Sequence, residues 1–154
     1  MAVQSFKPET LLIAQDVRVA FFDVDGVLTD GGVYFSEHGE ILKRLSILAG
    51  YGHKLLRRAG ITPVVITGRD SKPLRVRLEA LGLEHVRYGT EDKLPAAQAL
   101  LTQLGLAWTQ AAAVGDDWPD LPVLSRVAFA GAPPNAHVEG RALAHPVTSG
   151  RGGR

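Results

Sequence analysis

The sequence predicts a three-layer α/β domain, in which helices cover both faces of a mostly parallel β-sheet. Short runs of β-branched or aromatic residues alternate along the chain with longer segments of helical spacing. The length of 154 residues, with 45% hydrophobic and 21% charged residues, is typical of one compact domain. We therefore expect residues 1–154 to form a single domain.

Five short β-branched or aromatic segments are predicted to be strands, and the near-continuous apolar runs VAFF and PVVI among them indicate strands buried on both faces. They are Arg18–Phe22, Thr62–Ile66, His85–Tyr88, Ala111–Val114 and Val127–Ala130. The segments between them repeat apolar residues at helical spacing, as Leu74, Leu78 and Leu81 do at i, i+4 and i+7. Three glycines follow these segments in the position of C-terminal helix caps, namely Gly60, Gly82 and Gly105.

Residues 31–46 interrupt the alternation directly after the first strand. They hold two short apolar stretches, Val33–Phe35 and Ile41–Leu42, around a polar turn at residues 36–40, which predicts a β-hairpin. A two-stranded ribbon cannot bury this apolar surface by itself, so we expect burial against another subunit. The Gly- and Arg-rich residues 149–154 are predicted to form a mobile tail.

The composition argues against several classes of protein. The 17 Lys and Arg and 16 Asp and Glu leave a net charge of +1, which gives no electrostatic reason to expect nucleic acid or an anionic membrane as partner. The absence of cysteine excludes disulfides, zinc–thiolate sites and thiol nucleophiles. No apolar run approaches the ~20 residues of a membrane span. Residues 1–16 also lack the pattern of a secretory signal, so we expect a cytoplasmic protein.

Polar side chains follow the predicted strands at the points where ligands bind in open parallel sheets. Asp23 and Asp25 follow the first strand, Thr67-Gly68-Arg69 follow the second, and Lys93 precedes the third helix. Asp116, Asp117 and Asp120 follow the fourth strand of the sequence. Any one of these groups could be a capping or turn residue. All four together, in this order, indicate a functional site.

The chemistry of these groups indicates a metal site that handles phosphate. Asp23 and Asp25 are two residues apart and point the same way, so they repel each other unless a cation lies between them or one of them is protonated. With Asp116 they form an oxygen-only site of the kind that binds Mg²⁺. A carboxylate there can attack phosphorus, while the Thr67 hydroxyl and the Lys93 charge stabilise the transferred phosphoryl group.

The order of these motifs resembles the haloacid-dehalogenase-like (HAD) phosphohydrolase superfamily. More narrowly, DVDGVLTDG, the hairpin, VVITGR and GDDWPDLPV are similar to the small 3-deoxy-D-manno-octulosonate 8-phosphate phosphatases, over nearly the whole chain from Val19 to Thr148. The resemblance implies a Rossmann-like fold without a cap domain and a dependence on Mg²⁺. It also implies a homotetramer in which the hairpin of one subunit helps to enclose the active site of a neighbour.

The resemblance also implies a role for each matching residue. Asp23 corresponds to the nucleophile and a metal ligand, and Asp25 to the general acid and base whose backbone carbonyl binds the metal. Asp116 corresponds to the remaining carboxylate ligand, and Thr67 and Lys93 to the groups that hold the phosphoryl oxygens. The expected orienting carboxylates are Asp117 and Asp120. The residues expected to contact substrate are Asp25, Ser46, Gly50, Lys54, Arg69, Arg77 and Lys93.

Residues 46–52 depart from the family pattern. Leu48 and Ala49 stand where the family has an arginine and an aspartate, which removes a cation that could bind an anionic substrate. The expected function is hydrolysis of a phosphorylated sugar acid, foremost 3-deoxy-D-manno-octulosonate 8-phosphate. A nonulosonate 9-phosphate or another small sugar phosphate is the alternative substrate. A catalytically silent oligomerisation domain is the alternative of another class, against which the retained site residues argue.

Overall fold

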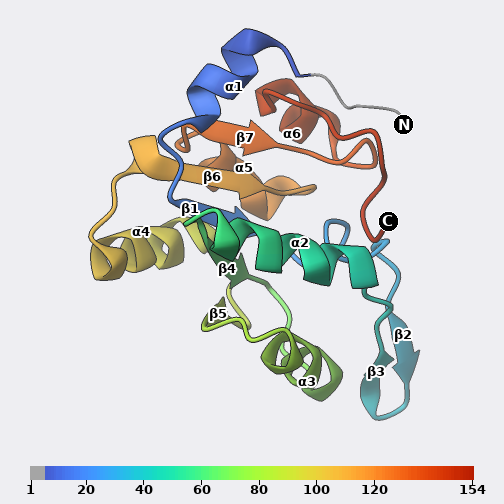
Figure 1. Cartoon of the computed structure of the whole chain (residues 1–154). Helices are drawn as coiled ribbons and strands as arrows, with labels where there is room; N and C mark the ends of the chain where they lie inside the picture. Colours follow the sequence, from blue (N-terminus) through green and yellow to red (C-terminus); the bar gives the residue numbers. More distant parts are fainter. Residues whose placement is uncertain (1–5) are drawn as a thin grey trace.

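A computed structural model describes residues 6–154 of the chain, and its central feature is a five-stranded sheet (Figure 1). The strands, all parallel, are β1 (Val19–Phe22), β4 (Thr62–Ile66), β5 (His85–Arg87), β6 (Ala111–Val114) and β7 (Phe129–Gly131). Their order across the sheet is β5-β4-β1-β6-β7. The predicted fold class is confirmed. Residues 1–5, which belong to the expected domain and to the segment searched for a secretory signal, lie outside the described residues.

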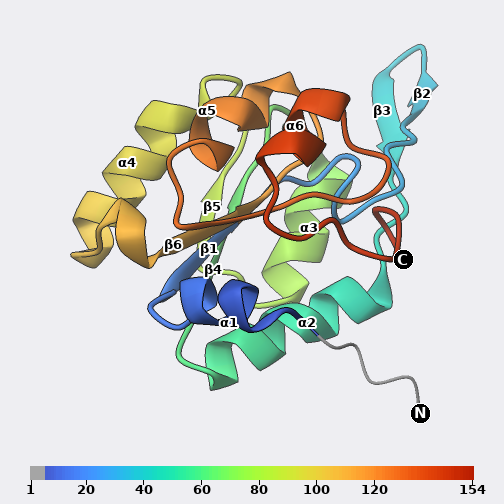
Figure 2. The ribbon, with the colours of Figure 1, turned by 90° about the horizontal axis from the view of Figure 1, so that it is seen from above.

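Helices lie on both faces of this sheet, as the view from above shows (Figure 2). They are α1 (Pro8–Ala14), α2 (Ile47–Arg58), α3 (Lys72–Ala80), α4 (Lys93–Leu104), α5 (Leu121–Leu124) and α6 (Val138–Leu143). Two short 3₁₀ helices, η1 (Trp108–Gln110) and η2 (Trp118–Asp120), flank β6. No helix within residues 6–154 is long and apolar enough to cross a lipid bilayer.

Strands β1, β4 and β6 are largely buried on both faces, to which successive side chains point in turn. Val19 and Phe21 of β1 pack with the leucines of α4 and α5, whereas the next residue along, Ala20, belongs to a cluster on the other face. Leu74 and Leu78 of α3 extend the core on that second face. The near-continuous apolar runs of β1 and β4 therefore correspond to strands covered on both faces, whereas each residue of the edge strand β5 is partly exposed.

Some elements differ from the sequence-based expectation. Strand β7 begins at Phe129, two residues later than predicted, because Val127 still belongs to the helical turn after α5 and donates its N–H to the Val123 carbonyl. Helix α1 was not predicted. Its sequence lacks the apolar pattern of a helix with a buried face, because none of its residues is buried and Leu11 and Leu12 face solvent.

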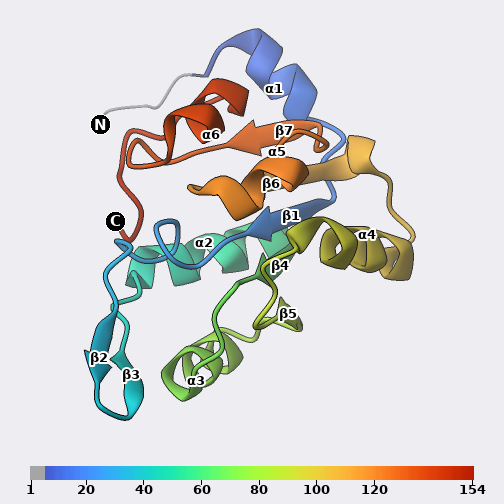
Figure 3. The same ribbon diagram turned by 180° about the vertical axis from the view of Figure 1, so that it is seen from behind.

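The hairpin after β1 is present as predicted, but its turn is tighter. Strands β2 (Tyr34–Ser36) and β3 (Gly39–Leu42) pair antiparallel, with Ser36 opposite Gly39. Gly39 has a φ of 104°, which an L side chain rarely adopts, and this permits a turn of two residues instead of five. Figure 3 shows the hairpin projecting from the body of the domain.

The C-terminal residues 149–154 are packed against the domain, which differs from the predicted mobile tail. The backbone N–H of Gly152 donates to Asn135 Oδ1 over 2.8 Å, and that of Gly153 donates to the Val27 carbonyl over 3.0 Å. A Cβ atom on Gly152 would lie 1.8 Å from the Gly26 carbonyl oxygen. The glycine content predicted mobility, but here the missing side chains permit a close backbone contact.

Candidate functional site

The loop after β1 brings its acidic residues to the carboxyl edge of the sheet. The N–H groups of Leu28 and Thr29 donate to the Val24 carbonyl, so the chain turns back directly beyond the strand. The Thr29 hydroxyl closes the loop by accepting from the N–H of Gly26 over 3.2 Å. A Cβ on Gly26 would lie 1.8 Å from Asp116 Oδ2, so glycine permits this loop to approach the one after β6.

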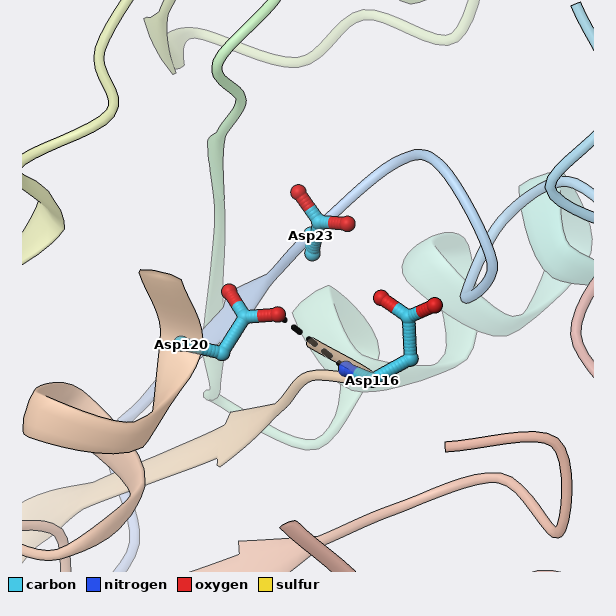
Figure 4. Close-up of side chains that lie close together, drawn as sticks. All are labelled: Asp23, Asp116 and Asp120. Atoms are coloured by element: carbon cyan, nitrogen blue, oxygen red, sulfur yellow. Dashed lines mark hydrogen bonds between the residues drawn. The ribbon is translucent and has the colours of Figure 1, made fainter. Parts of the chain in front are cut away.

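Three carboxylates converge at this edge from separate segments (Figure 4). Asp23 follows β1, Asp116 follows β6, and Asp120 ends η2, and each offers an oxygen within 4.8 Å of the others. The convergence follows from the sheet, because β1 and β6 are neighbours and the N–H of Asp23 donates to the Val114 carbonyl over 3.1 Å. The prediction that parallel strand ends would gather Asp23 and Asp116 agrees with this geometry.

Lys93 links two of these carboxylates from the first residue of α4. Its Nζ lies 2.5 Å from Asp23 Oδ1 and 2.6 Å from Asp120 Oδ1, and all three residues are buried. Burial would lower the pKa of Lys93, but the two carboxylates outweigh it and raise that pKa. Lys93 is therefore a fixed positive charge beside Asp23.

Asp120 has donors on both of its oxygens. Besides the Lys93 contact, Asp120 Oδ2 accepts from the N–H of Asp116 over 3.1 Å and from that of Asp117 over 3.3 Å. Asp120 thereby orients both Lys93 and the loop that carries Asp116. Asp117 is exposed, and its carboxylate accepts from the N–H of Trp118 at the start of η2.

The charges of Asp23 and Asp116 are poorly compensated. Burial, and then the nearby charge of Asp120, raises the pKa of Asp23 to about 6, against the lowering effect of Lys93. Burial and the charges of Asp23 and Asp120 raise the pKa of Asp116 to about 7. Asp116 Oδ1 is also buried with no hydrogen-bond partner among the described residues. An oxygen-only donor set with an unpartnered buried oxygen fits a hard divalent cation such as Mg²⁺.

We predict that stabilisation by Mg²⁺ grows with pH. Between the unfolded pKa of 3.8 and folded values near 6 and 7, folded Asp23 and Asp116 retain protons that the unfolded chain has lost. The free energy of unfolding of the metal-free protein therefore falls as pH rises through this range. A cation that displaces these protons therefore binds more tightly at the upper end of this pH range.

The measurement is the shift in Tm on adding a fixed Mg²⁺ concentration. We expect a larger shift at about pH 8 than at about pH 5, and no shift in Asp116→Asn. Equal shifts in Tm at the two pH values would contradict the proposed cation site.

The Asp25 carboxylate lies between two cations. Lys43 Nζ is 2.8 and 3.0 Å from its two oxygens, and Arg69 Nε is 3.4 Å from Oδ2. Arg69 was expected here, but Lys43 was missed. Nothing in the sequence marks Lys43, because one lysine after a hairpin strand is ordinarily solvent-exposed.

These groups border a cavity of about 390 Å³. Among its lining residues are Asp23, Asp25, Arg69, Lys93 and Asp116. Thr67, predicted to hold the phosphoryl oxygens, is fully buried directly after β4 and does not line this cavity; its hydroxyl accepts from the N–H of Arg69 over 3.2 Å. Acids and cations therefore share one small opening.

Four of the residues predicted to contact substrate do not line this cavity: Ser46, Gly50, Lys54 and Arg77. Ser46 caps the start of α2, with its hydroxyl accepting from the N–H of Ala49. Gly50 is buried, and a Cβ atom on it would lie 3.3 Å from an Arg77 nitrogen. Lys54 is exposed on α2. Within one chain these residues form no site with Asp23, and their substrate roles stay predictions.

Comparisons with known proteins give a consistent result, although no family model matches the chain. The 3-deoxy-D-manno-octulosonate 8-phosphate phosphatase KdsC of Yersinia pestis is 40% identical over 92% of this chain and 75% of its own length. KdsC of Salmonella typhimurium is 37% identical over 96% of this chain and 78% of its own.

Solved structures show the same likeness. A YrbI-family phosphatase structure from Pseudomonas syringae has a TM-score of 0.91 and 42% identity, over 96% of this chain and 84% of that one. The Moraxella catarrhalis 3-deoxy-D-manno-octulosonate 8-phosphate phosphatase, in complex with magnesium, phosphate and KDO, has a TM-score of 0.90 and 33% identity. That match covers 95% of this chain and 84% of the other.

Proposed function

This chain belongs to the KdsC family of 3-deoxy-D-manno-octulosonate 8-phosphate phosphatases in the HAD superfamily, and we propose that it is a Mg²⁺-dependent phosphatase of a phosphorylated sugar acid. The observation that carries the proposal is the convergence of Asp23, Asp116 and Lys93 beside one cavity. A silent structural domain would have no need to gather carboxylates whose charge Lys93 compensates only in part, because their desolvation costs free energy.

The first step transfers the phosphoryl group to the protein. An Asp23 carboxylate oxygen attacks phosphorus, the ester P–O bond breaks, and the Asp25 carboxyl gives its proton to the leaving alkoxide oxygen. An aspartyl-phosphate on Asp23 and the free alcohol result. Lys93, 2.5 Å from Asp23 Oδ1, holds the nucleophile in place and offsets the negative charge of the equatorial oxygens.

The second step returns the protein to its starting state. A water oxygen attacks phosphorus of the aspartyl-phosphate, and the Asp25 carboxylate takes the proton of that water. The bond between phosphorus and the Asp23 oxygen breaks, releasing inorganic phosphate. Asp25 lines the same cavity as Asp23, which supports this double role.

Asp23 and Asp116, with the backbone carbonyl of Asp25, would hold the Mg²⁺ ion. When bound, the ion neutralises charge on the phosphoryl oxygens and permits an anionic nucleophile to approach an anionic substrate. The family relative from Moraxella catarrhalis, whose structure contains magnesium, supports this choice of metal.

The proposed substrate is 3-deoxy-D-manno-octulosonate 8-phosphate. Its phosphate and carboxylate are both anionic, and Arg69 and Lys93 supply positive charge at the cavity. The relatives from Yersinia pestis and Moraxella catarrhalis carry that substrate in their names, which supports the assignment. A nonulosonate 9-phosphate is the second candidate substrate. The reason is Leu48, which is 74% exposed at the start of α2 and stands where the family pattern has an arginine.

The test is phosphate release from purified protein with Mg²⁺, compared as kcat/KM across a panel of phosphomonoesters. We expect 3-deoxy-D-manno-octulosonate 8-phosphate to exceed glucose 6-phosphate by at least about tenfold. A nonulosonate 9-phosphate above both would move the assignment to that substrate. Equal values for neutral sugar phosphates would contradict a sugar-acid phosphatase, and no release from any ester would favour the silent domain.

We further propose that the hairpin joins copies of this chain into a homotetramer. Tyr34, Phe35, Ile41 and Leu42 of β2 and β3 are each more than half exposed, although all are apolar or aromatic. Several exposed apolar side chains gathered on one hairpin ordinarily mark an interface. The family resemblance supports a second copy as the partner, and closure of the site by a neighbour would suit a chain without a cap domain.

Light scattering tests the tetramer. We expect Leu42→Glu to lower the molar mass of the wild-type assembly, because a charge on the hairpin must be desolvated in the interface. Val76→Glu, at an equally exposed apolar position on α3, is the matched control and should leave the mass unchanged. A monomeric wild type would contradict the proposal.

A further inference from the structure

Lys43 lies directly after β3, and its side chain is completely shielded from solvent. An ammonium group is buried in proteins only where anions compensate the loss of water. Here Lys43 Nζ contacts both oxygens of Asp25, at 2.8 and 3.0 Å, and lies 3.6 Å from Glu40 Oε2. The compensating groups are therefore one carboxylate at the cavity and one in the hairpin.

Glu40 fixes this arrangement to a third segment. Its Oε1 accepts a hydrogen bond from Ser71 Oγ over 2.6 Å, and Ser71 immediately precedes α3. Arg69, two residues earlier in the same loop, approaches Asp25 Oδ2. The hairpin, the loop after β1 and the loop after β4 are thus joined through one polar network around Asp25.

The position of Lys43 distinguishes it from a cation that binds substrate. Asp25 and Arg69 line the cavity of about 390 Å³, whereas Lys43 is absent from its lining. Lys43 therefore reaches the site only through Asp25. A carboxylate side chain can rotate about two torsions, and donors to both of its oxygens hold it in one orientation.

We infer that Lys43 is a positioning residue that holds the Asp25 carboxylate toward the leaving oxygen and links it to the hairpin. The inference rests on the proposed function, in which Asp25 serves the leaving alkoxide. Proton transfer requires heavy atoms within about 2.6–3.2 Å, so a misplaced carboxylate slows it sharply. An aryl leaving group departs without receiving a proton, and its reaction depends far less on Asp25.

The kinetic test compares two esters in Lys43→Met. We use kcat/KM, since it reports the first step alone, before water attacks the aspartyl-phosphate. For 3-deoxy-D-manno-octulosonate 8-phosphate we expect a fall of about 10²-fold, and for p-nitrophenyl phosphate a fall of less than about tenfold. Lys43→Arg should recover part of the loss, because it retains a buried donor to Asp25.

The control is Arg44→Met, which removes a cation from the adjacent, exposed position and should leave both values unchanged. Equal falls for the two esters in Lys43→Met would overturn the inference, since a general loss of structure affects both alike. Unchanged values would overturn it as well. If the wild type hydrolyses neither ester, the proposed function has failed before any variant is compared.

A stability cycle tests the contact without using activity. We expect the double variant Lys43→Met, Asp25→Asn to have a Tm well above the value obtained by adding the two single losses, because each single variant leaves one group without its partner. Additive losses would show that the two side chains do not interact, and they would overturn the inference whether or not the protein is an active phosphatase.

Discussion

Asp23→Asn is expected to abolish turnover, lowering kcat by at least about 10³-fold, because the amide cannot attack phosphorus. The same change should leave the metal-free protein folded, because Lys93 retains Asp120 as a buried partner. Burial raises the pKa of Asp23 to about 6, so its ionised form costs folding free energy above that pH, and a neutral amide avoids the cost. Loss of activity together with retained stability separates a chemical role from a structural one.

The control for this variant is Asp30→Asn. Asp30 lies in the same loop but is exposed, and its Oδ1 accepts from the N–H of Gly32, which an amide oxygen can also do. We expect its phosphate release to match the wild type. An Asp23→Asn protein that still turned over substrate, or hydrolysis that needed no Mg²⁺, would rule out the aspartyl-phosphate route.

Lys93→Met is expected to damage both stability and activity. Lys93 stands between the buried Asp23 and Asp120, so its removal leaves two neighbouring carboxylates without a cation. Removing one partner from a buried ion pair costs about 3–5 kcal/mol. For a chain of this length that loss of stability corresponds to a Tm lower by roughly 10 °C, measured without Mg²⁺ at about pH 8. The lost stabilisation of the phosphoryl group should lower kcat by at least about 10²-fold.

Two further variants serve as comparisons for Lys93→Met. Lys72→Met removes a lysine at the same first position of α3, where the side chain is exposed, and should change neither Tm nor kcat. Lys93→Arg retains the positive charge of the lysine but not the shape of its side chain. Compared with Lys93→Met, we therefore expect it to recover more of the stability than of the activity. A Lys93→Met protein with the wild-type Tm would show that the Asp23 and Asp120 contacts do not contribute to folding.

The sequence determined the architecture and the inner part of the site. Apolar runs of a few residues, separated by helical spacing, can be satisfied only by strands covered on both faces, and parallel strands place their carboxyl ends at one edge. Asp23 and Asp116 were therefore predictable from their place after strands β1 and β6. Lys93 was predictable for a related reason, since it begins the helix that enters the same edge.

Other features depended on contacts between distant segments, which local patterns cannot encode. Lys43 is buried because Asp25, Glu40 and the loop after β4 meet around it, although its neighbours in the chain are ordinary hairpin residues. The C-terminal glycines have the composition of a mobile segment, yet Gly152 is buried against the Gly26 loop.

The charge balance of the chain shows the same division. A net charge of +1 describes a balanced surface, but it does not reveal that Asp23, Asp116 and Asp120 meet within 4.8 Å at one edge. The placement of Asp23, Asp116 and Lys93 at this edge followed from the sequence, since strand ends and residue types determine it. How those residues are held, and at what cost in desolvation, was decided by the tertiary structure, because burial and pairing exist only once the chain has folded.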